Sequence, residues 1–133
     1  MSLNTAVRNW TSQRVWVVGA SSGIGLALAQ ALISLGARVA VSARRAEPLL
    51  ALASAHPQQV LALPLNMTEN ADWDSAWNNI NSAWQGADWV VFCAADYTPI
   101  RAWELNRDRA AQLIDINFTG TLRGVATVLP DFL

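Results

Sequence analysis

Three glycines and two serines between positions 19 and 25 form the segment with the clearest chemical potential. The residues read Gly19-Ala20-Ser21-Ser22-Gly23-Ile24-Gly25, so the glycines follow the spacing Gly-x-x-x-Gly-x-Gly. Glycine lets a backbone turn sharply and approach a ligand, and a helix that begins directly after such a turn offers free N–H groups to a phosphate. The segment therefore predicts a phosphate-binding turn. The alternative is a strand-to-helix turn that holds no ligand.

Two serines and two arginines are candidates for contacts with the same ligand. The hydroxyls of Ser21 and Ser22 can bond either to a phosphate or back to the local backbone. Dinucleotide-binding units that select NAD place an acidic residue at the end of the second strand, where it binds the ribose diol. In this chain Ala43 stands at that position, and Arg44 and Arg45 follow it directly. Because a guanidinium can pair with a 2′-phosphate through its planar fork, these residues favour NADP(H) over NAD(H). The alternative is that both arginines are solvated residues at the start of a helix.

Residues that could carry catalysis are scarce. The sequence contains no lysine, one histidine and one tyrosine. Tyr97 is followed four residues later by Arg101 rather than by lysine, and a guanidinium is a poor member of a proton relay. Nothing in the local sequence activates the thiol of Cys93, so we interpret it as a buried structural cysteine. We predict no catalytic role for Tyr97 and no bound metal.

The elements that must position these residues alternate between strand and helix. Apolar runs predict strands over 15–18, 38–42, 60–63 and 88–93, and helical patterns predict helices over 23–35, 45–55, 72–84 and 106–129. In the last helix Ile114, Asn117 and Val125 share the apolar side, and Pro130 is expected to end it. Alternating strands and helices with short connections imply a parallel sheet with right-handed crossovers. The predicted fold is one α/β domain over 1–133, a Rossmann-like doubly wound sheet of about four strands in the order 3-2-1-4 with helices on both faces.

The glycine segment, Asn117 and the region after Val90 resemble the short-chain dehydrogenase/reductase family, whose cofactor loop has the same glycine spacing. The resemblance covers nearly the whole chain but only about the first half of such an enzyme. It implies a nicotinamide dinucleotide cofactor and hydride transfer between the nicotinamide and a carbonyl or alcohol. Family members continue into a catalytic serine and a Tyr-x-x-x-Lys pair, which a sequence without lysine does not contain.

The resemblance also assigns residues around the cofactor. After the third strand the family has an aspartate beside the adenine, and Asn66-Met67 stand at this position. The Asn66 amide oxygen could accept a bond from the adenine amino group, or the residue could shape a turn. The family's Asn-Asn-Ala-Gly becomes Phe92-Cys93-Ala94-Ala95 in this chain. Ala94 and Ala95 keep the small size that lets a ribose approach the backbone.

Asn117 is the one member of the family's catalytic set with a counterpart in this sequence. In the family the equivalent asparagine bends a helix and holds a water of the proton relay. The alternative is a core asparagine whose amide is satisfied by backbone groups. Either role requires a partner, because an unpaired amide in the apolar side of a helix costs about 1–3 kcal/mol.

Composition excludes several classes of function. Nine arginines nearly balance ten acidic residues, so the net charge of −1 favours neither nucleic acid nor an anionic membrane surface as a partner. No apolar run approaches the roughly 18 residues of a membrane span, and a single cysteine agrees with a reducing compartment, so we expect a cytoplasmic protein. The predicted fourth strand has an unpaired outer edge, and such an edge favours a homo-oligomer.

These features predict the NADP(H)-binding part of a short-chain dehydrogenase/reductase-type oxidoreductase. The chain is expected to be a truncated form that is inactive as given, and a carbonyl or alcohol substrate is expected only for a full-length parent. Two alternatives to this oxidoreductase part stay open, and neither of them is an enzyme. One is a non-catalytic module that binds or senses NADP(H), and the other is a non-functional remnant without ligand.

Overall fold

A computed structural model describes residues 5–133 and contains a parallel sheet. Its strands are β1 (Arg14–Val18), β2 (Arg38–Ser42), β3 (Val60–Ala62) and β4 (Trp89–Phe92). They lie in the order β3-β2-β1-β4, which confirms the predicted order 3-2-1-4. Because β1 is central, the chain leaves it first toward β2 and later returns to its other side as β4.

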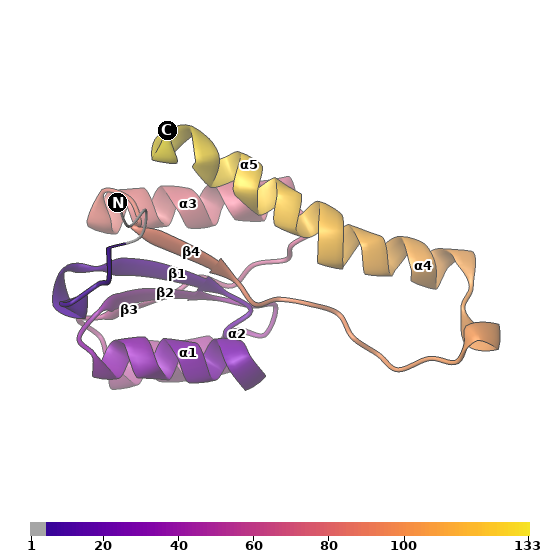
Figure 1. The fold of residues 1–133 in the computed structure, drawn as a ribbon, viewed down its shortest axis with the longest axis horizontal. Helices are drawn as coiled ribbons and strands as arrows, with labels where there is room; N and C mark the ends of the chain where they lie inside the picture. The colour runs from indigo at the N-terminus through magenta and orange to yellow at the C-terminus, as the bar shows by residue number, and fades with distance from the viewer. Residues whose placement is uncertain (1–4) are drawn as a thin grey trace.

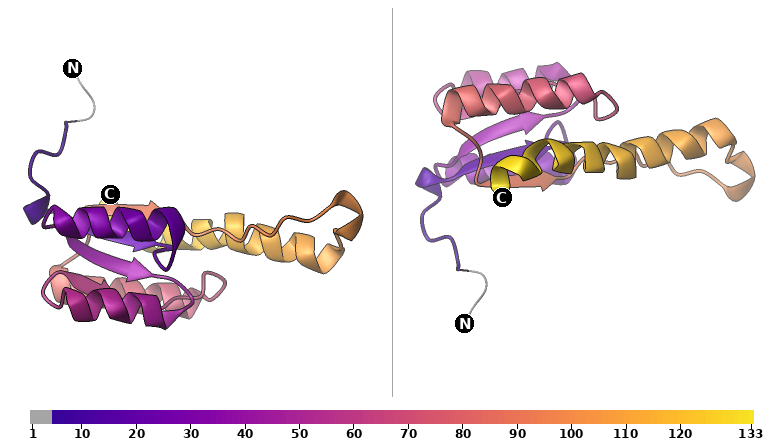
Figure 2. Two further views of the ribbon diagram at one scale, coloured as in Figure 1. Left: turned by 90° about the horizontal axis from the view of Figure 1, so that it is seen from below. Right: turned by 90° about the horizontal axis from the view of Figure 1, so that it is seen from above.

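Helices cover both faces of this sheet, as predicted. They are α1 (Gly23–Ser34), α2 (Ala46–Ala55), α3 (Asn70–Trp84), α4 (Arg107–Ile114) and α5 (Gly120–Phe132), with the 3-10 turns η1 (Trp10–Ser12) and η2 (Ala102–Glu104). Figure 1 shows α1 and α2 below the sheet and α3 and α5 above it. The views in Figure 2 show that α4 and the loop before it extend beyond the ends of the strands.

Two apolar layers hold the sheet between the helices. The layer toward α1 and α2 is built from aliphatic residues such as Val17, Leu32 and Val41, and the layer toward α3 and α5 is dominated by tryptophans. Trp16 is fully buried, stacks on Trp77 with ring centroids 6.0 Å apart, and donates its indole N–H to the Ser42 hydroxyl at 2.9 Å. On α3, Trp73 and Trp77 are both buried.

The carboxyl-terminal helix differs from the prediction. Instead of one helix over 106–129, the π-helical turn η3 (Asp115–Thr119) separates α4 from α5. A π-helical turn holds more residues than an α-helical one, so it rotates the faces that follow it. The buried residues of α5 are therefore Gly120, Gly124 and Val128, while the side chain of Ile114 is 60% exposed and Asn117 is also exposed.

Pro130 does not end the last helix but lies inside it, because α5 continues to Phe132. Proline lacks a backbone N–H and therefore costs one helical hydrogen bond. In the final turn this loss is confined to a single bond, and the Leu133 N–H still donates to the Leu129 carbonyl at 3.2 Å.

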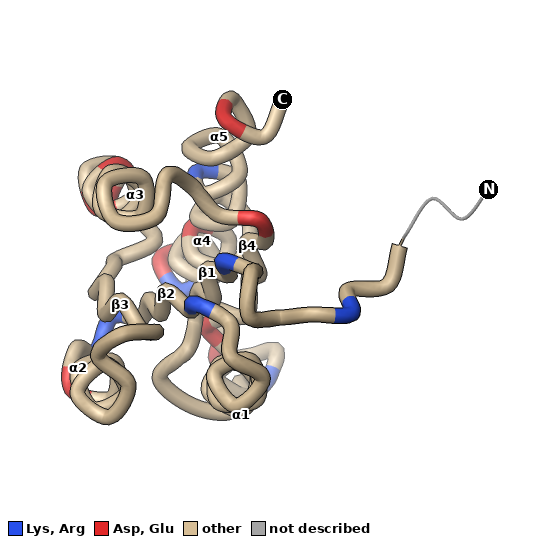
Figure 3. The backbone as a smooth tube through the Cα atoms, turned by 90° about the vertical axis from the view of Figure 1, so that its left-hand side faces the viewer, with Lys and Arg blue, Asp and Glu red and all other residues tan. Residues whose placement is uncertain are grey.

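Within residues 5–133, no helix is both long enough and apolar enough to span a bilayer. Figure 3 shows acidic and basic residues interspersed along the chain rather than gathered in blocks of one sign.

Candidate functional site

A cleft of about 460 Å³ opens where the carboxyl ends of the strands meet the loops that follow them. It lies beside β1, where successive strands begin to be added on the other side of the sheet, the usual position of ligands in open α/β sheets. Most of the predicted cofactor residues line it: Gly19, Ser21, Ser22, Arg44, Arg45, Asn66, Met67, Ala94 and Ala95. Gly23, Ile24 and Gly25 are not among the lining residues, and they form the first turn of α1. The Ile24 side chain is 82% exposed.

The glycines are required mainly by contacts within the chain. Gly19 has a φ of +93°, and a Cβ there would collide with the backbone N of Ala94. A Cβ on Gly25 would collide with the Gly19 carbonyl oxygen, whereas a Cβ on Gly23 would meet no atom within 4 Å. Gly23 needs only the left-handed conformation that its φ of +58° represents. At Gly19 and Gly25, therefore, the close approach predicted from the spacing is between parts of the protein itself.

The turn between β1 and α1 presents hydrogen-bonding groups to the cleft. The Ser42 carbonyl accepts hydrogen bonds from the N–H groups of Gly19 and Ala20 at 2.7 and 3.0 Å, so the end of β2 fixes the turn. Ser22 is the N-cap of α1 but makes no side-chain capping bond. Among the described residues, no hydrogen-bond partner is found for the hydroxyl of Ser21 or Ser22. Both hydroxyls are thus available to a ligand rather than bonded back to the backbone.

Two arginines form a basic wall of the same cleft. Arg44 and Arg45 are exposed and follow β2, with Arg45 as the N-cap of α2. In the region 5–133 the ion pairs are Arg14–Asp88, Arg109–Asp96 and Arg123–Asp115, so neither cleft arginine is paired with a carboxylate. A guanidinium without a carboxylate partner can take an anionic group of a ligand.

Asn66 has its amide oxygen engaged in a turn. The oxygen accepts hydrogen bonds from the Thr68 N–H at 3.1 Å and from the Thr68 hydroxyl at 2.9 Å. This geometry is that of an Asx-turn, which was the alternative to a contact with adenine. The next residue, Met67, is buried beneath α5, and its carbonyl accepts the indole N–H of Trp73 at 3.1 Å. Asn66 therefore shapes the floor of the cleft together with Met67.

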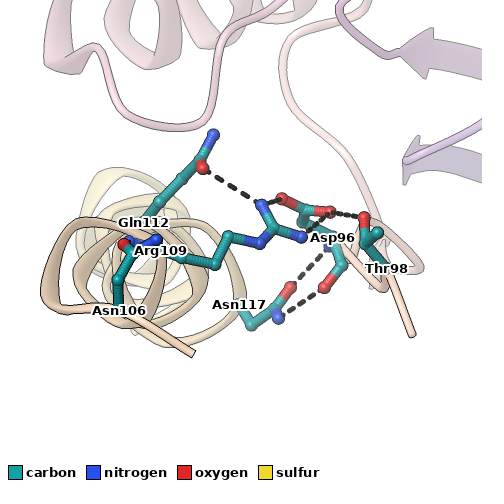
Figure 4. Close-up of polar contacts among 6 residues, drawn as sticks. All are labelled: Asp96, Thr98, Asn106, Arg109, Gln112 and Asn117. Atoms are coloured by element: carbon teal, nitrogen blue, oxygen red, sulfur yellow. Dashed lines mark hydrogen bonds and ion pairs between the residues drawn. The ribbon is translucent and has the colours of Figure 1, made fainter. Parts of the chain in front are cut away.

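Asn117 lies in η3 and clamps the loop that follows β4. Its Oδ1 accepts the backbone N–H of Asp96 at 2.7 Å, and its Nδ2 donates to the Asp96 carbonyl at 2.9 Å (Figure 4). The amide thus has backbone partners, the arrangement that the sequence interpretation left open as an alternative. The two hydrogen bonds hold Ala95 and Asp96 at the mouth of the cleft, which both residues line.

The sequence interpretation missed Asp96 and Gln112, which also line the cleft. Asp96 follows Ala95 directly and could have been found by extending the alanine segment by one position. Gln112 lies on α4, and no local sequence signal marks it as a residue of the cleft. The interpretation of Cys93 as a buried structural cysteine was wrong, because Cys93 is only half-buried and lines the cleft. Tyr97 is 84% exposed and does not line the cleft.

Asp96 is the acidic group of this site, and its environment favours the ionised form. The hydrogen bonds from the Arg109 guanidinium, opposed in part by desolvation, hold the pKa of Asp96 below its usual range. The charges of Arg109 and, at longer range, Arg44 act in the same direction. The cleft therefore combines a basic wall with one carboxylate that already has a cationic partner.

Comparison with known proteins gives consistent matches along the chain. Residues 13–133 match a family model described as short chain dehydrogenase. Dehydrogenase/reductase SDR family member 7 of Mus musculus is 32% identical over 130 residues, which cover 92% of this chain and 38% of that protein.

Two solved structures extend this comparison to three dimensions. A short-chain dehydrogenase from Streptomyces avermitilis has a TM-score of 0.83 at 30% identity, over 91% of this chain and 45% of that one. A carbonyl reductase from chicken fatty liver, solved with NADPH bound, has a TM-score of 0.80 at 23% identity, over 89% of this chain and 47% of that one, and this match shows the fold alone. The chain spans less than half the length of these proteins.

Proposed function

The chain belongs to the short-chain dehydrogenase family, and from this premise we propose that its cleft binds a nicotinamide dinucleotide, with NADP(H) preferred over NAD(H). Membership of the family implies a cofactor of this class. The observation that carries the preference is the position of Arg44 and Arg45 on the cleft wall without carboxylate partners in residues 5–133. Ala43 precedes them where an acidic residue would select the ribose diol of NAD(H).

The residues of the cleft fit the chemical groups of such a cofactor. The hydroxyls of Ser21 and Ser22, which have no partner within residues 5–133, and the N–H groups at the start of α1 suit a pyrophosphate. Both kinds of group donate hydrogen bonds, and the helix dipole favours negative charge. Arg44, supported by Arg45, suits a 2′-phosphate, and the small side chains of Ala94 and Ala95 leave room for a ribose. Gly19 shapes the turn that lines the cleft, and Gly23, Ile24 and Gly25 form the first turn of α1, so the N–H groups at the start of this helix are their own.

The proposed role of these 133 residues is to bind and orient the cofactor. When bound, the nicotinamide would supply or accept a hydride, and in the family the partner is a carbonyl or an alcohol. Asn117 would hold the loop at Asp96, and in this respect it is a positioning residue of the site. The sequence has no lysine and therefore no Tyr-x-x-x-Lys pair, so we propose cofactor binding without turnover for this chain by itself.

Titration of the tryptophan fluorescence with NADPH and NADH tests the proposal. We expect binding in the micromolar range and a preference for NADPH of about tenfold or more, which corresponds to about 1.4 kcal/mol. Arg44→Gln should remove most of this preference. Arg38→Gln is the matched control, because Arg38 is an exposed arginine at the opposite end of β2. Equal affinities for both cofactors in the wild-type chain would refute the role of Arg44.

Because the sequence has no lysine, we propose as a second candidate function a module that binds NADP(H) and senses it without reacting. A turnover assay with an aldehyde and NADPH separates the two when this chain is compared with the same chain joined to a segment that carries the missing catalytic residues. Cofactor binding without oxidation is expected for either function in this chain alone, and restored oxidation on joining a segment that carries the serine and the Tyr-x-x-x-Lys pair would support the oxidoreductase. If the chain bound neither NADPH nor NADH, both functions would be refuted and the chain would be a non-functional remnant.

We further propose that the protein forms a homo-oligomer. Within residues 5–133, β4 pairs only with β1, so its outer edge has no strand partner. Unpaired strand edges promote association. Large apolar side chains of the α4–η3–α5 arm are also exposed, including Phe118 and Leu122 at 61% and 50%.

A further inference from the structure

Asp96 places a carboxylate in a cleft that otherwise suits an anionic ligand. The residue follows Ala95, lines the cleft, and has a side chain that is 18% exposed. Arg109, on α4, binds this carboxylate through both of its terminal nitrogens, with Nη1–Oδ2 at 2.9 Å and Nη2–Oδ1 at 3.3 Å (Figure 4). Such a two-pronged pair fixes orientation as well as charge.

Both partners of this ion pair are held in place by other groups. The backbone of Asp96 is clamped by the Asn117 amide, as described above. Arg109 Nη1 also donates to the Gln112 Oε1 at 3.0 Å, and the Arg109 backbone N–H is capped by the Asn106 side chain at 2.9 Å. The Arg109 side chain is 20% exposed. The arrangement therefore positions one cation against one anion at the edge of the cleft.

The charge of Asp96 also reaches Arg44, which is among the groups that stabilise the ionised form of this carboxylate. If Arg109 were absent, the free carboxylate would repel the phosphates of a dinucleotide. It would also compete with a 2′-phosphate for the Arg44 guanidinium. Because salt screens the interaction between solvent-exposed charges, this competition is strongest at low salt.

We infer that Arg109 is a positioning residue for cofactor binding: it neutralises the Asp96 carboxylate and so leaves Arg44 free for the 2′-phosphate of NADP(H). The inference rests on the proposed function, since it concerns the same cleft. It assigns Arg109 an effect on cofactor choice although Arg109 is not a cleft-lining residue. The alternative role is purely structural, with the ion pair holding α4 to the loop after β4.

Substitution of either partner separates these roles by the sign of the effect. Arg109→Met leaves the carboxylate unpaired, and we expect the Kd for NADPH to rise about tenfold at low salt and the Kd for NADH to rise less. Asp96→Asn alone should lower the Kd for NADPH, because it removes the carboxylate and leaves the positive charge of Arg109 at the edge of the cleft. The double variant Asp96→Asn/Arg109→Met should recover the wild-type Kd, and Arg109→Lys should recover it in part, because lysine keeps the positive charge.

Controls distinguish a failed inference from a misfolded variant or a failed proposed function. Near-UV circular dichroism and the thermal midpoint report whether each variant keeps the native fold. Raising the salt concentration should shrink the Arg109→Met defect. Equal losses of NADPH affinity in Asp96→Asn, Arg109→Met and the double variant would overturn the inference and indicate the structural role. Wild-type protein that binds neither cofactor would overturn the proposed function and, with it, the inference.

Discussion

At the scale of single residues, arginine–aspartate pairs fasten both ends of β4. Arg109–Asp96 lies beyond its carboxyl end, and Arg14–Asp88 lies at its amino end, where Nη2–Oδ1 is 2.8 Å and Nε–Oδ2 is 3.0 Å. Arg14 Nη1 also donates to the carbonyls of Trp84 and Gln85, which ties the end of α3 to the sheet. Charge-assisted hydrogen bonds therefore anchor both ends of β4, the edge strand that pairs with β1 alone in the described sheet.

The Arg14–Asp88 pair makes stability depend on pH in a defined direction. The hydrogen bonds from Arg14, opposed in part by desolvation, lower the pKa of Asp88 below its usual value in the folded state. A carboxyl with a depressed folded pKa stabilises the protein above its unfolded pKa of about 3.9, and this contribution is lost as the pH falls through the folded value. Asp88→Asn should therefore lower the free energy of unfolding by about 1 kcal/mol at pH 7, since the pair is partly solvated.

Urea unfolding of the wild-type and Asp88→Asn chains between pH 7 and about pH 3 measures this contribution. The difference between the two chains should shrink toward the acidic end. Asp74→Asn is the control, because Asp74 is exposed on α3 and forms no ion pair within the described part of the chain. A difference that stays constant across the range would show that Asp88 acts by packing rather than by charge.

At the scale of elements, two glycines determine how closely α5 can lie on the sheet. A Cβ on Gly124 would come within 2.6 Å of the rings of both Phe92 and Trp73, and a Cβ on Gly120 within 3.0 Å of the Met67 Cβ. Glycine in a helix interior costs about 1 kcal/mol relative to alanine. The close packing of α5 on β4 and α3 therefore offsets the low helix propensity of these two glycines.

Gly124→Ala tests which of these two effects is larger. Helix propensity alone would raise the free energy of unfolding by about 1 kcal/mol, whereas overpacking typically lowers it by about 1–3 kcal/mol. We expect a net loss, because the colliding atoms belong to two rings in the core. Urea denaturation gives the sign, and near-UV circular dichroism reports the environment of Trp73. Ala126→Ser, on the exposed side of α5, is the control. A stabilised Gly124→Ala chain would contradict the expectation.

The same elements show what could be predicted from the sequence. Strand β2 was predicted with its observed bounds, and the order of the sheet followed from the alternation of apolar runs and helices, because both signals are local. The glycine turn was placed at the cleft for the same reason. The apolar side predicted for one helix over 106–129 was wrong, because η3 divides that helix where Asn117 contacts Asp96, 21 positions away in the sequence. Arg109 was missed because its partner Asp96 lies 13 positions away, in the loop after β4.

At the scale of the whole molecule, an α/β body carries an arm whose outer face is apolar. The arm consists of α4, η3 and α5, and Figure 2 shows its α4 end extending past the strands. Ile114, Phe118, Leu122 and Leu129 on this arm are between 45% and 61% exposed, and we call these four residues the arm stripe. Exposed apolar side chains that gather on one element mark an interaction surface more often than scattered ones do.

The arm stripe and the outer edge of β4 together predict concentration-dependent self-association. Sedimentation equilibrium across a wide concentration range should give a mass that rises above that of the monomer. Phe118→Glu/Leu122→Glu should shift the equilibrium toward monomer, because association would bury the new charges without partners. Leu50→Glu is the matched control, since Leu50 is 54% exposed on α2, in the opposite helical layer. Association that survives in the double variant would assign it to the β4 edge instead, whereas a monomeric wild-type chain at every concentration would exclude both surfaces. Cofactor affinity measured beside the mass then shows whether the cleft functions in a single copy of the chain.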